Sequence, residues 1–169
     1  MNASFLLYGL MLFFLYISLG KNKLKKLGFK KTDLLEETIH AVFYLFLMLA
    51  VTILIGVIFY SFGMASDTAK VPEIIKSISL EEVLSIIVVG SIVEEAFFRG
   101  YLLKKTNLLM SSFIFSYFHI IYGSLSEVIG AFFLGLILGI EFMKRKNLFT
   151  PALTHVLYNL IMILLVYSV

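Results

Sequence analysis

The sequence contains no cysteine and no tryptophan, and only 15% of its 169 residues are charged. Without cysteine, the chain has no disulfide bond, no thiolate metal site and no cysteine nucleophile. Without tryptophan, tyrosine is left as the interfacial aromatic anchor. Hydrophobic residues make up 60% of the chain and the mean hydropathy is +1.00, whereas soluble domains are about 45–50% apolar. The composition therefore predicts an integral membrane protein in contact with the lipid bilayer.

Several sequence signatures of function are also missing. No Gly-x-Ser-x-Gly segment is present, so an acyl-enzyme route through a serine nucleophile has little support. No His-Glu-x-x-His segment is present, so the common zinc-binding helix motif is absent. The net charge is only +3 and the lysines fall in short loops between apolar runs. We therefore expect no nucleic-acid partner, because nucleic-acid binders gather basic residues on one face.

About six apolar stretches have lengths near the ~20 residues that a membrane-spanning helix needs. They cover residues 4–20, 39–62, 82–103, 108–122, 127–143 and 151–167. We expect an all-α, polytopic transmembrane helix bundle that forms a single domain over residues 1–169. The first stretch has no basic segment before it and no clear cleavage site, so we expect a retained helix rather than a signal peptide. Residues 63–79 form either a short amphipathic surface helix or a plain loop.

Lysine and arginine concentrate in alternate loops. The loops after the first, third and fifth stretches hold Lys21, Lys23, Lys25, Lys26, Lys30, Lys31, Lys104, Lys105, Lys144, Arg145 and Lys146. In the second loop Lys70 and Lys76 are offset by Asp67 and Glu73, and the fourth loop has no basic residue. The positive-inside rule then places the basic loops in the cytoplasm and both termini outside it, with the cell membrane as the expected location.

Charged residues interrupt the third apolar stretch, where Glu94 and Glu95 are followed by Arg99. Each charge at membrane depth costs about 2.5–3.5 kcal/mol on insertion scales, so such residues are kept where they are paired or line a cavity. Glu95 and Arg99 are four residues apart and can form an ion pair on one helix face. Glu94 lies about 100° around the helix and is expected to face a cavity.

Two further polar groups lie at similar depth on other helices. At 1.5 Å per residue, Glu94 and His119 lie roughly 15 Å from the basic end of their stretches, and His155 lies about 8 Å from its own. His155 and Asn159 share one helix face, and Thr150 before Pro151 predicts a capped helix start. Each group alone would be explained as packing or interhelical hydrogen bonding. Together they predict one polar site in the cytoplasmic half of the membrane.

Small residues follow one face of the fifth stretch. Ala131, Gly135 and Gly139 recur every four residues, a spacing that lets another helix approach closely. We expect this stripe to pack within the bundle rather than to form a dimer.

These residues resemble the motifs of a known family. Glu94-Glu95-Ala-Phe-Phe-Arg99 resembles the EExxxR motif of the CPBP (CAAX protease and bacteriocin-processing, or Abi) intramembrane proteases. Phe115 to His119 looks like the family's FxxxH motif, and His155 to Asn159 looks like its HxxxN motif. The three motifs occur in the family's order, and the resemblance covers residues 80–169, which would be the protease-like core.

The resemblance implies a role for each of these residues. Glu94 would be the general base, His119 would help to bind the water, and His155 and Asn159 would stabilise the oxyanion. Glu95, Arg99 and Phe115 would support them. The family has been described both as metal-free glutamate proteases and as metalloproteases, in which Glu94, His119 and His155 would bind a metal such as zinc. We favour the metal-free mechanism.

The expected function is therefore hydrolysis of a peptide bond in a peptide or protein with a membrane-proximal segment. Two other functions stay open at this point. The same cavity would serve a non-catalytic membrane scaffold or bacteriocin-immunity protein, and intramembrane Glu and His residues also build proton relays in transporters. No inverted repeat or broken-helix pair is visible, which argues against a transporter.

The topology is testable with a fusion reporter. A reporter attached after Val169 is expected to lie outside the cytoplasm, because the alternating loop charges place an even number of spans between two non-cytoplasmic termini. A reporter fused within residues 21–31 is the control and should be cytoplasmic. Cytoplasmic activity of the reporter after Val169 would refute this arrangement.

Overall fold

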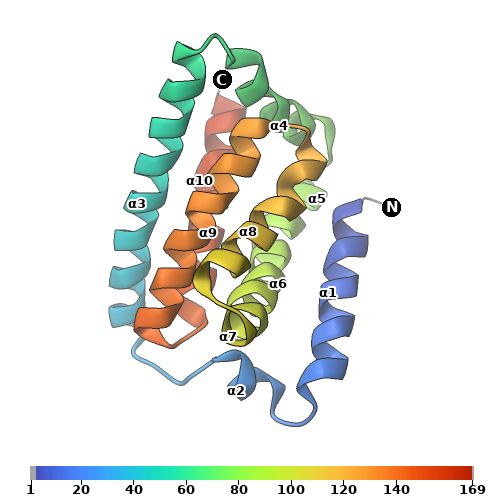
Figure 1. The fold of residues 1–169 in the computed structure, drawn as a ribbon, viewed down its shortest axis with the longest axis vertical. Helices are drawn as coiled ribbons and strands as arrows, with labels where there is room; N and C mark the ends of the chain where they lie inside the picture. Colours follow the sequence, from blue (N-terminus) through green and yellow to red (C-terminus); the bar gives the residue numbers. More distant parts are fainter. Residues whose placement is uncertain (1–2, 169) are drawn as a thin grey trace.

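The computed structural model describes residues 3–168, and every regular element in that range is a helix (Figure 1). The all-α prediction is confirmed. The longest elements are α1 (Ala3–Leu19), α3 (Leu34–Ser61), α9 (Leu125–Arg145) and α10 (Phe149–Ser168). Shorter ones are α2 (Lys23–Leu27), α4 (Ala65–Ser77) and α8 (Leu108–Phe118), which continues into the 3-10 turn η3 (His119–Tyr122).

The third apolar stretch forms a rod of five helical segments. They are α5 (Leu80–Ser85), the π-helical η1 (Ile86–Gly90), α6 (Ser91–Glu95), the π-helical η2 (Ala96–Leu102) and α7 (Leu103–Lys105). Ser79 and Glu82 start the rod with a reciprocal capping box, which satisfies two backbone N–H groups. The π-helical segments flank the five residues that hold Glu94 and Glu95. Such segments widen the helix and are frequent at functional sites.

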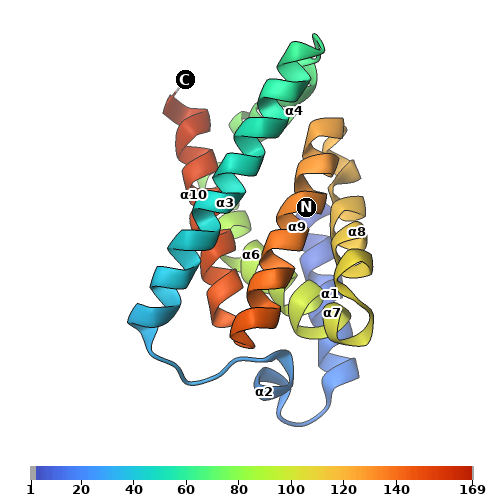
Figure 2. The same ribbon diagram turned by 60° about the vertical axis from the view of Figure 1, so that its left-hand side comes forward.

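Helices α3, α9 and α10 pack against one another, while α1 packs on the opposite side against α6 and η2 (Figures 1 and 2). Helix α2, helix α7 and the turn between α9 and α10 lie together at the lower end of Figure 1. The three lysine-rich loops therefore share one end of the bundle. Which end faces the cytoplasm stays a prediction.

The small-residue stripe of α9 packs against α8. A Cβ added to Gly135 would lie 3.2 Å from Phe115 Cδ1 and 3.2 Å from Ser112 Cβ, and one added to Gly139 would collide with Leu108. Ala131 is buried in the same core cluster as Phe115. The expected close helix approach within the bundle is confirmed.

Three of the described helices are long and apolar enough to cross a membrane, namely α3, α9 and α10. The apolar segments Leu6–Leu19 and Leu108–Tyr122 are shorter, and the third stretch is divided by its π-helical turns. The count of six spans therefore stays a prediction. Helix α4 shows that residues 63–79 are not a plain loop.

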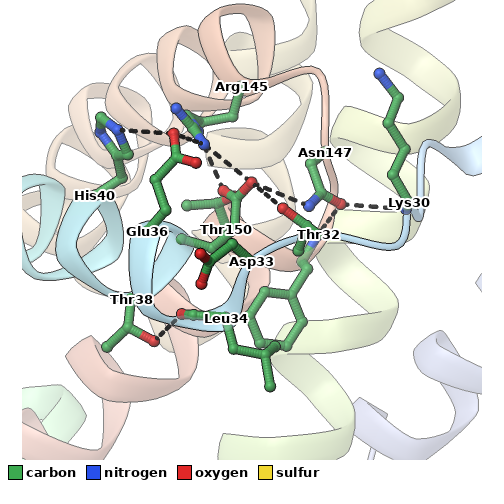
Figure 3. A network of polar contacts seen from close by, with 12 residues as sticks. Lys30, Thr32, Asp33, Leu34, Glu36, Thr38, His40, Arg145, Asn147 and Thr150 are labelled. Atoms are coloured by element: carbon green, nitrogen blue, oxygen red, sulfur yellow. Dashed lines mark hydrogen bonds and ion pairs between the residues drawn. The ribbon is translucent and has the colours of Figure 1, made fainter.

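A network of polar side chains that includes Arg145, Asn147 and Thr150 holds the lower ends of α3, α9 and α10 together (Figure 3). The buried carboxylate of Glu37 belongs to this network. Glu37 of α3 accepts hydrogen bonds from the guanidinium of Arg145, the amide of Asn147 and the hydroxyls of Thr32 and Thr150. The predicted cap at Thr150 is wrong because its hydroxyl is bonded to Glu37. Helix α10 begins at Phe149, whose N–H donates to Asn147 Oδ1 at 3.3 Å.

Replacing Glu37 tests this network. Glu37→Ala is expected to lower the free energy of unfolding by about 3 kcal/mol, because it leaves several buried donors without an acceptor. The neighbouring Glu36 also pairs with Arg145, but its side chain is 57% exposed against 3% for Glu37.

The matched control is therefore Glu36→Ala, which should cost at most about 1 kcal/mol. Reversible unfolding in mixed detergent micelles measures both variants. Equal losses of unfolding free energy in the two variants would contradict the claim that the buried Glu37 stabilises the protein more than the exposed Glu36.

Candidate active site

Glu95 and Arg99 form the predicted ion pair, and both side chains are fully buried. Arg99 Nη1 donates to Glu95 Oε1 at 2.7 Å, and Nη2 donates to the carbonyl of Gly135 on α9 at 3.3 Å. The guanidinium carbon lies 4.4 Å from the ring centroid of Phe115, within cation–π range. The pair thus joins the α6–η2 rod to α8 and α9.

His155 of α10 lies between the two glutamates. Its Nδ1 is 3.0 Å from Glu95 Oε1, and its Nε2 is 3.9 Å from Glu94 Oε2. An ionised carboxylate only accepts hydrogen bonds, so Nδ1 carries a hydrogen and Nε2 is the atom that faces Glu94. One turn further along α10, Asn159 Nδ2 donates to Ser91 Oγ at 2.9 Å. Asn159 therefore keeps one N–H free for another acceptor.

His119 is held by the backbone of its own helix. Its Nδ1 lies 2.8 Å from the carbonyl oxygen of Phe115, and the two rings are 4.6 Å apart. Because a carbonyl only accepts, Nδ1 carries a hydrogen and Nε2 is left free. His119 lies where α8 passes into the 3-10 turn η3, and its side chain lines the cavity.

The predicted site residues meet at a cavity of about 290 Å³. Glu94, His119, His155 and Asn159 all line it, whereas Glu95, Arg99 and Phe115 lie behind this wall. Tyr8 of α1 adds a hydroxyl beside Glu94. Much of the remaining wall is apolar, with side chains from α3, α4 and α10. The cavity thus combines a small polar end with room for an apolar ligand.

Helix α4 closes one side of this cavity with Val71, Pro72 and Ile75. Asp67 attaches α4 to the start of α9, accepting from the backbone N–H groups of Leu125 at 3.1 Å and Ser126 at 2.8 Å. Burial raises the pKa of Asp67, but these hydrogen bonds outweigh it and hold the pKa below its ordinary value. The stabilisation is present above the ordinary carboxyl pKa and is lost only as the pH falls through the lowered folded-state value.

Several polar residues that line the cavity were not predicted from the sequence, among them Tyr8, Tyr122 and Glu127, and neither was the role of Asp67 in attaching α4. Glu127 lies in the first turn of α9, a position where a carboxylate usually stabilises the helix start. Its place in the chain therefore suggested no contact with the site. Tyr122 ends the fourth predicted stretch and lines the cavity, whereas Asp67 lies in the connection between the second and third stretches and acts on the cavity wall only through α4.

The residues expected as metal ligands are Glu94, His119 and His155. Among residues 3–168, no group of three His, Asp or Glu side chains is placed to hold one metal ion. Glu94 and His155 are neighbours, but His119 does not complete a three-ligand set with them in this arrangement. The residues do not fit a metal site as they stand.

These features define a class of protein, an integral membrane protein with a buried carboxylate–imidazole cavity. Residues 76–161, just over half of the chain, match the family model described as type II CAAX prenyl endopeptidase Rce1-like. The chain belongs to this Rce1-like family, as the resemblance of its motifs suggested. The match includes Glu94, Glu95, Arg99, His119, His155 and Asn159. No curated protein and no solved structure matches the chain.

The buried ion pair can be tested by a double-mutant cycle. Arg99→Met is expected to lower the free energy of unfolding by about 3–5 kcal/mol, because it leaves the carboxylate of Glu95 buried without a cation. Adding Glu95→Gln removes that charge and should recover at least about 1 kcal/mol. A double variant with a lower free energy of unfolding than Arg99→Met alone would contradict this account. It would mean that the buried charge of Glu95 does not depend on Arg99 for its neutralisation.

Proposed function

We propose that the protein is an intramembrane endopeptidase in which Glu94 activates a water molecule to hydrolyse a peptide bond. The observation that carries this proposal is the different environment of two adjacent carboxylates. Glu95 is neutralised by Arg99, whereas Glu94 lines a cavity together with two imidazoles and an amide. A partly buried carboxylate that faces a cavity is suited to general-base catalysis.

The water is proposed to lie between Glu94 and His119. Glu94 accepts one of its protons as the water oxygen attacks the carbonyl carbon of the substrate. The free Nε2 of His119 accepts a hydrogen bond from the other water hydrogen, because Nδ1 is bonded to the carbonyl of Phe115. Two acceptors on one water orient its lone pair toward the substrate.

The oxyanion of the tetrahedral intermediate needs donors on the other side of the cavity. Asn159 has one N–H that is not used by Ser91. Nε2 of His155 is 3.9 Å from Glu94 Oε2, and in the proposed step this nitrogen carries a hydrogen. This N–H then donates to the oxyanion. The proton held by Glu94 passes to the leaving amine, which completes the hydrolysis without a covalent enzyme intermediate.

The membrane arrangement follows from the same proposal. We propose one domain with six spans, in the cell membrane, with the lysine-rich end of the bundle in the cytoplasm and the site in that half of the bilayer. The apolar wall formed by α3, α4 and α10 suits a peptide or protein segment next to the membrane. The substrate would therefore enter from the bilayer or its interface.

Glu94→Ala is the direct test of this mechanism. Because the general base is lost, cleavage of a peptide library by purified protein in lipid nanodiscs should fall by at least about 10³-fold. Products are measured by mass spectrometry, and size-exclusion chromatography shows whether the variant is folded.

The control is Glu81→Gln, which removes an exposed carboxylate near the start of the same helical rod. This variant should cleave at the wild-type rate. A folded Glu94→Ala protein with wild-type turnover would contradict the proposal, and so would the absence of cleavage by the wild-type protein.

A further inference from the structure

A second, much smaller space adjoins the main cavity on the side of α1. Its volume is about 10 Å³, close to the space that one buried water molecule needs. This small chamber is lined by Tyr8, Glu94, His119 and Tyr122, together with apolar side chains. The same four polar residues line the main cavity. The small chamber therefore meets the main cavity at the proposed general base.

The polar groups of the small chamber match the hydrogen bonding of a water molecule. A buried water usually makes about three hydrogen bonds to the polar groups around it. The carboxylate of Glu94 and the free Nε2 of His119 are acceptors for its two hydrogens. The hydroxyl of Tyr122 is a donor for its oxygen. One lone pair of the water is then left for attack on a carbonyl carbon.

Tyr8 is fixed in the wall of the small chamber by close packing. Its buried side chain belongs to the core cluster that also contains Val93 and Phe98. A Cβ added to Gly90 would lie 2.7 Å from the Tyr8 hydroxyl oxygen, so a glycine at this place leaves room for the hydroxyl. Gly90 ends η1 and lies four residues before Glu94. The Tyr8 hydroxyl faces the carboxylate of Glu94, to which it can donate a hydrogen bond.

A peptidase inside a membrane has to keep a water molecule beside its base while an apolar substrate fills the cavity. The main cavity has room for the substrate, and an apolar segment bound there would displace water from it. A water in the small chamber lies outside that space, and buried waters held by polar groups are costly to remove. The small chamber therefore separates the site of the water from the site of the substrate.

We propose that the small chamber binds the water that the reaction consumes, and that Tyr8 is a positioning residue for Glu94. This inference rests on the proposed peptidase function. It adds a residue of α1, which lies outside the matched residues 76–161. The Tyr8 hydroxyl donates to one carboxylate oxygen of Glu94 and so directs the other oxygen toward the water. Tyr8 acts through Glu94 and not on the substrate, so its effect falls on kcat and not on KM.

The kinetic test is Tyr8→Phe, which keeps the packed ring and removes the hydroxyl. Cleavage is followed in nanodiscs with a fluorogenic form of a library peptide that the wild-type protein cleaves. Because the carboxylate of Glu94 loses its orientation, kcat should fall by about 10- to 100-fold while KM changes by less than about twofold. A purely structural role of the Tyr8 ring would leave kcat unchanged. Size-exclusion chromatography shows whether the variant is folded.

The matched control is Tyr16→Phe, which removes a hydroxyl from an exposed tyrosine of the same helix. This variant should keep the wild-type kcat and KM. A second measurement concerns the water itself and does not need turnover. A crystal structure of the wild-type protein in lipid, at a resolution that shows ordered water, should contain one water within hydrogen-bond distance of Glu94 and His119 in the small chamber.

Three results would overturn the inference: a wild-type kcat in Tyr8→Phe, an effect of Tyr8→Phe confined to KM, or a small chamber without ordered water. By contrast, failure of the proposed function is a wild-type protein that cleaves nothing. The two failures are distinguished because the water is observed in the structure whether or not a peptide is cleaved.

Discussion

The ion pair between Glu95 and Arg99 is the interaction on which the polar centre of this bundle depends. Two fully buried charges lose several kcal/mol of hydration each, so they need close compensation. The 2.7 Å bond between them, the carbonyl of Gly135 and the ring of Phe115 supply it. Glu95 can then also accept from His155. With one glutamate neutralised in this way, its neighbour Glu94 is free to face the cavity.

Helix α10 is held in place along its length by hydrogen bonds to glutamate side chains of other helices. Thr150 donates to Glu37 of α3, Thr154 donates to Glu141 of α9, and His155 donates to Glu95 of the central rod. In a membrane, apolar contact with another helix gains little over contact with lipid, so interhelical polar bonds and close packing contribute more to specificity. These bonds fix the rotation of α10, and this rotation directs His155 and Asn159 into the cavity.

Local spacing was enough to predict an all-helical chain, the Glu95–Arg99 pair, a close helix approach at the small-residue stripe of α9 and the cavity shared by Glu94, His119, His155 and Asn159. Each of these depends on helix periodicity or on matched depth in apolar segments. The π-helical turns beside α6 were not predictable, because apolar runs have no signal for them. Thr150 was predicted as a helix cap and the role of Asp67 was missed, because their partners are distant in sequence. Glu127 was missed because only the fold brings the start of α9 to the cavity. Their hydroxyl or carboxylate groups otherwise fit ordinary positions at helix ends.

The most direct measurement of the central claim is chemical cross-linking between Glu94 and His155 in native membranes. The chain has no cysteine, so the pair Glu94→Cys with His155→Cys is the only site for a short thiol-to-thiol reagent. The account predicts efficient bridging of this pair. It predicts no bridging when His155→Cys is combined with a cysteine at the exposed Leu109 instead. Failure of the first pair to bridge in folded protein would mean that these helices do not converge on one cavity.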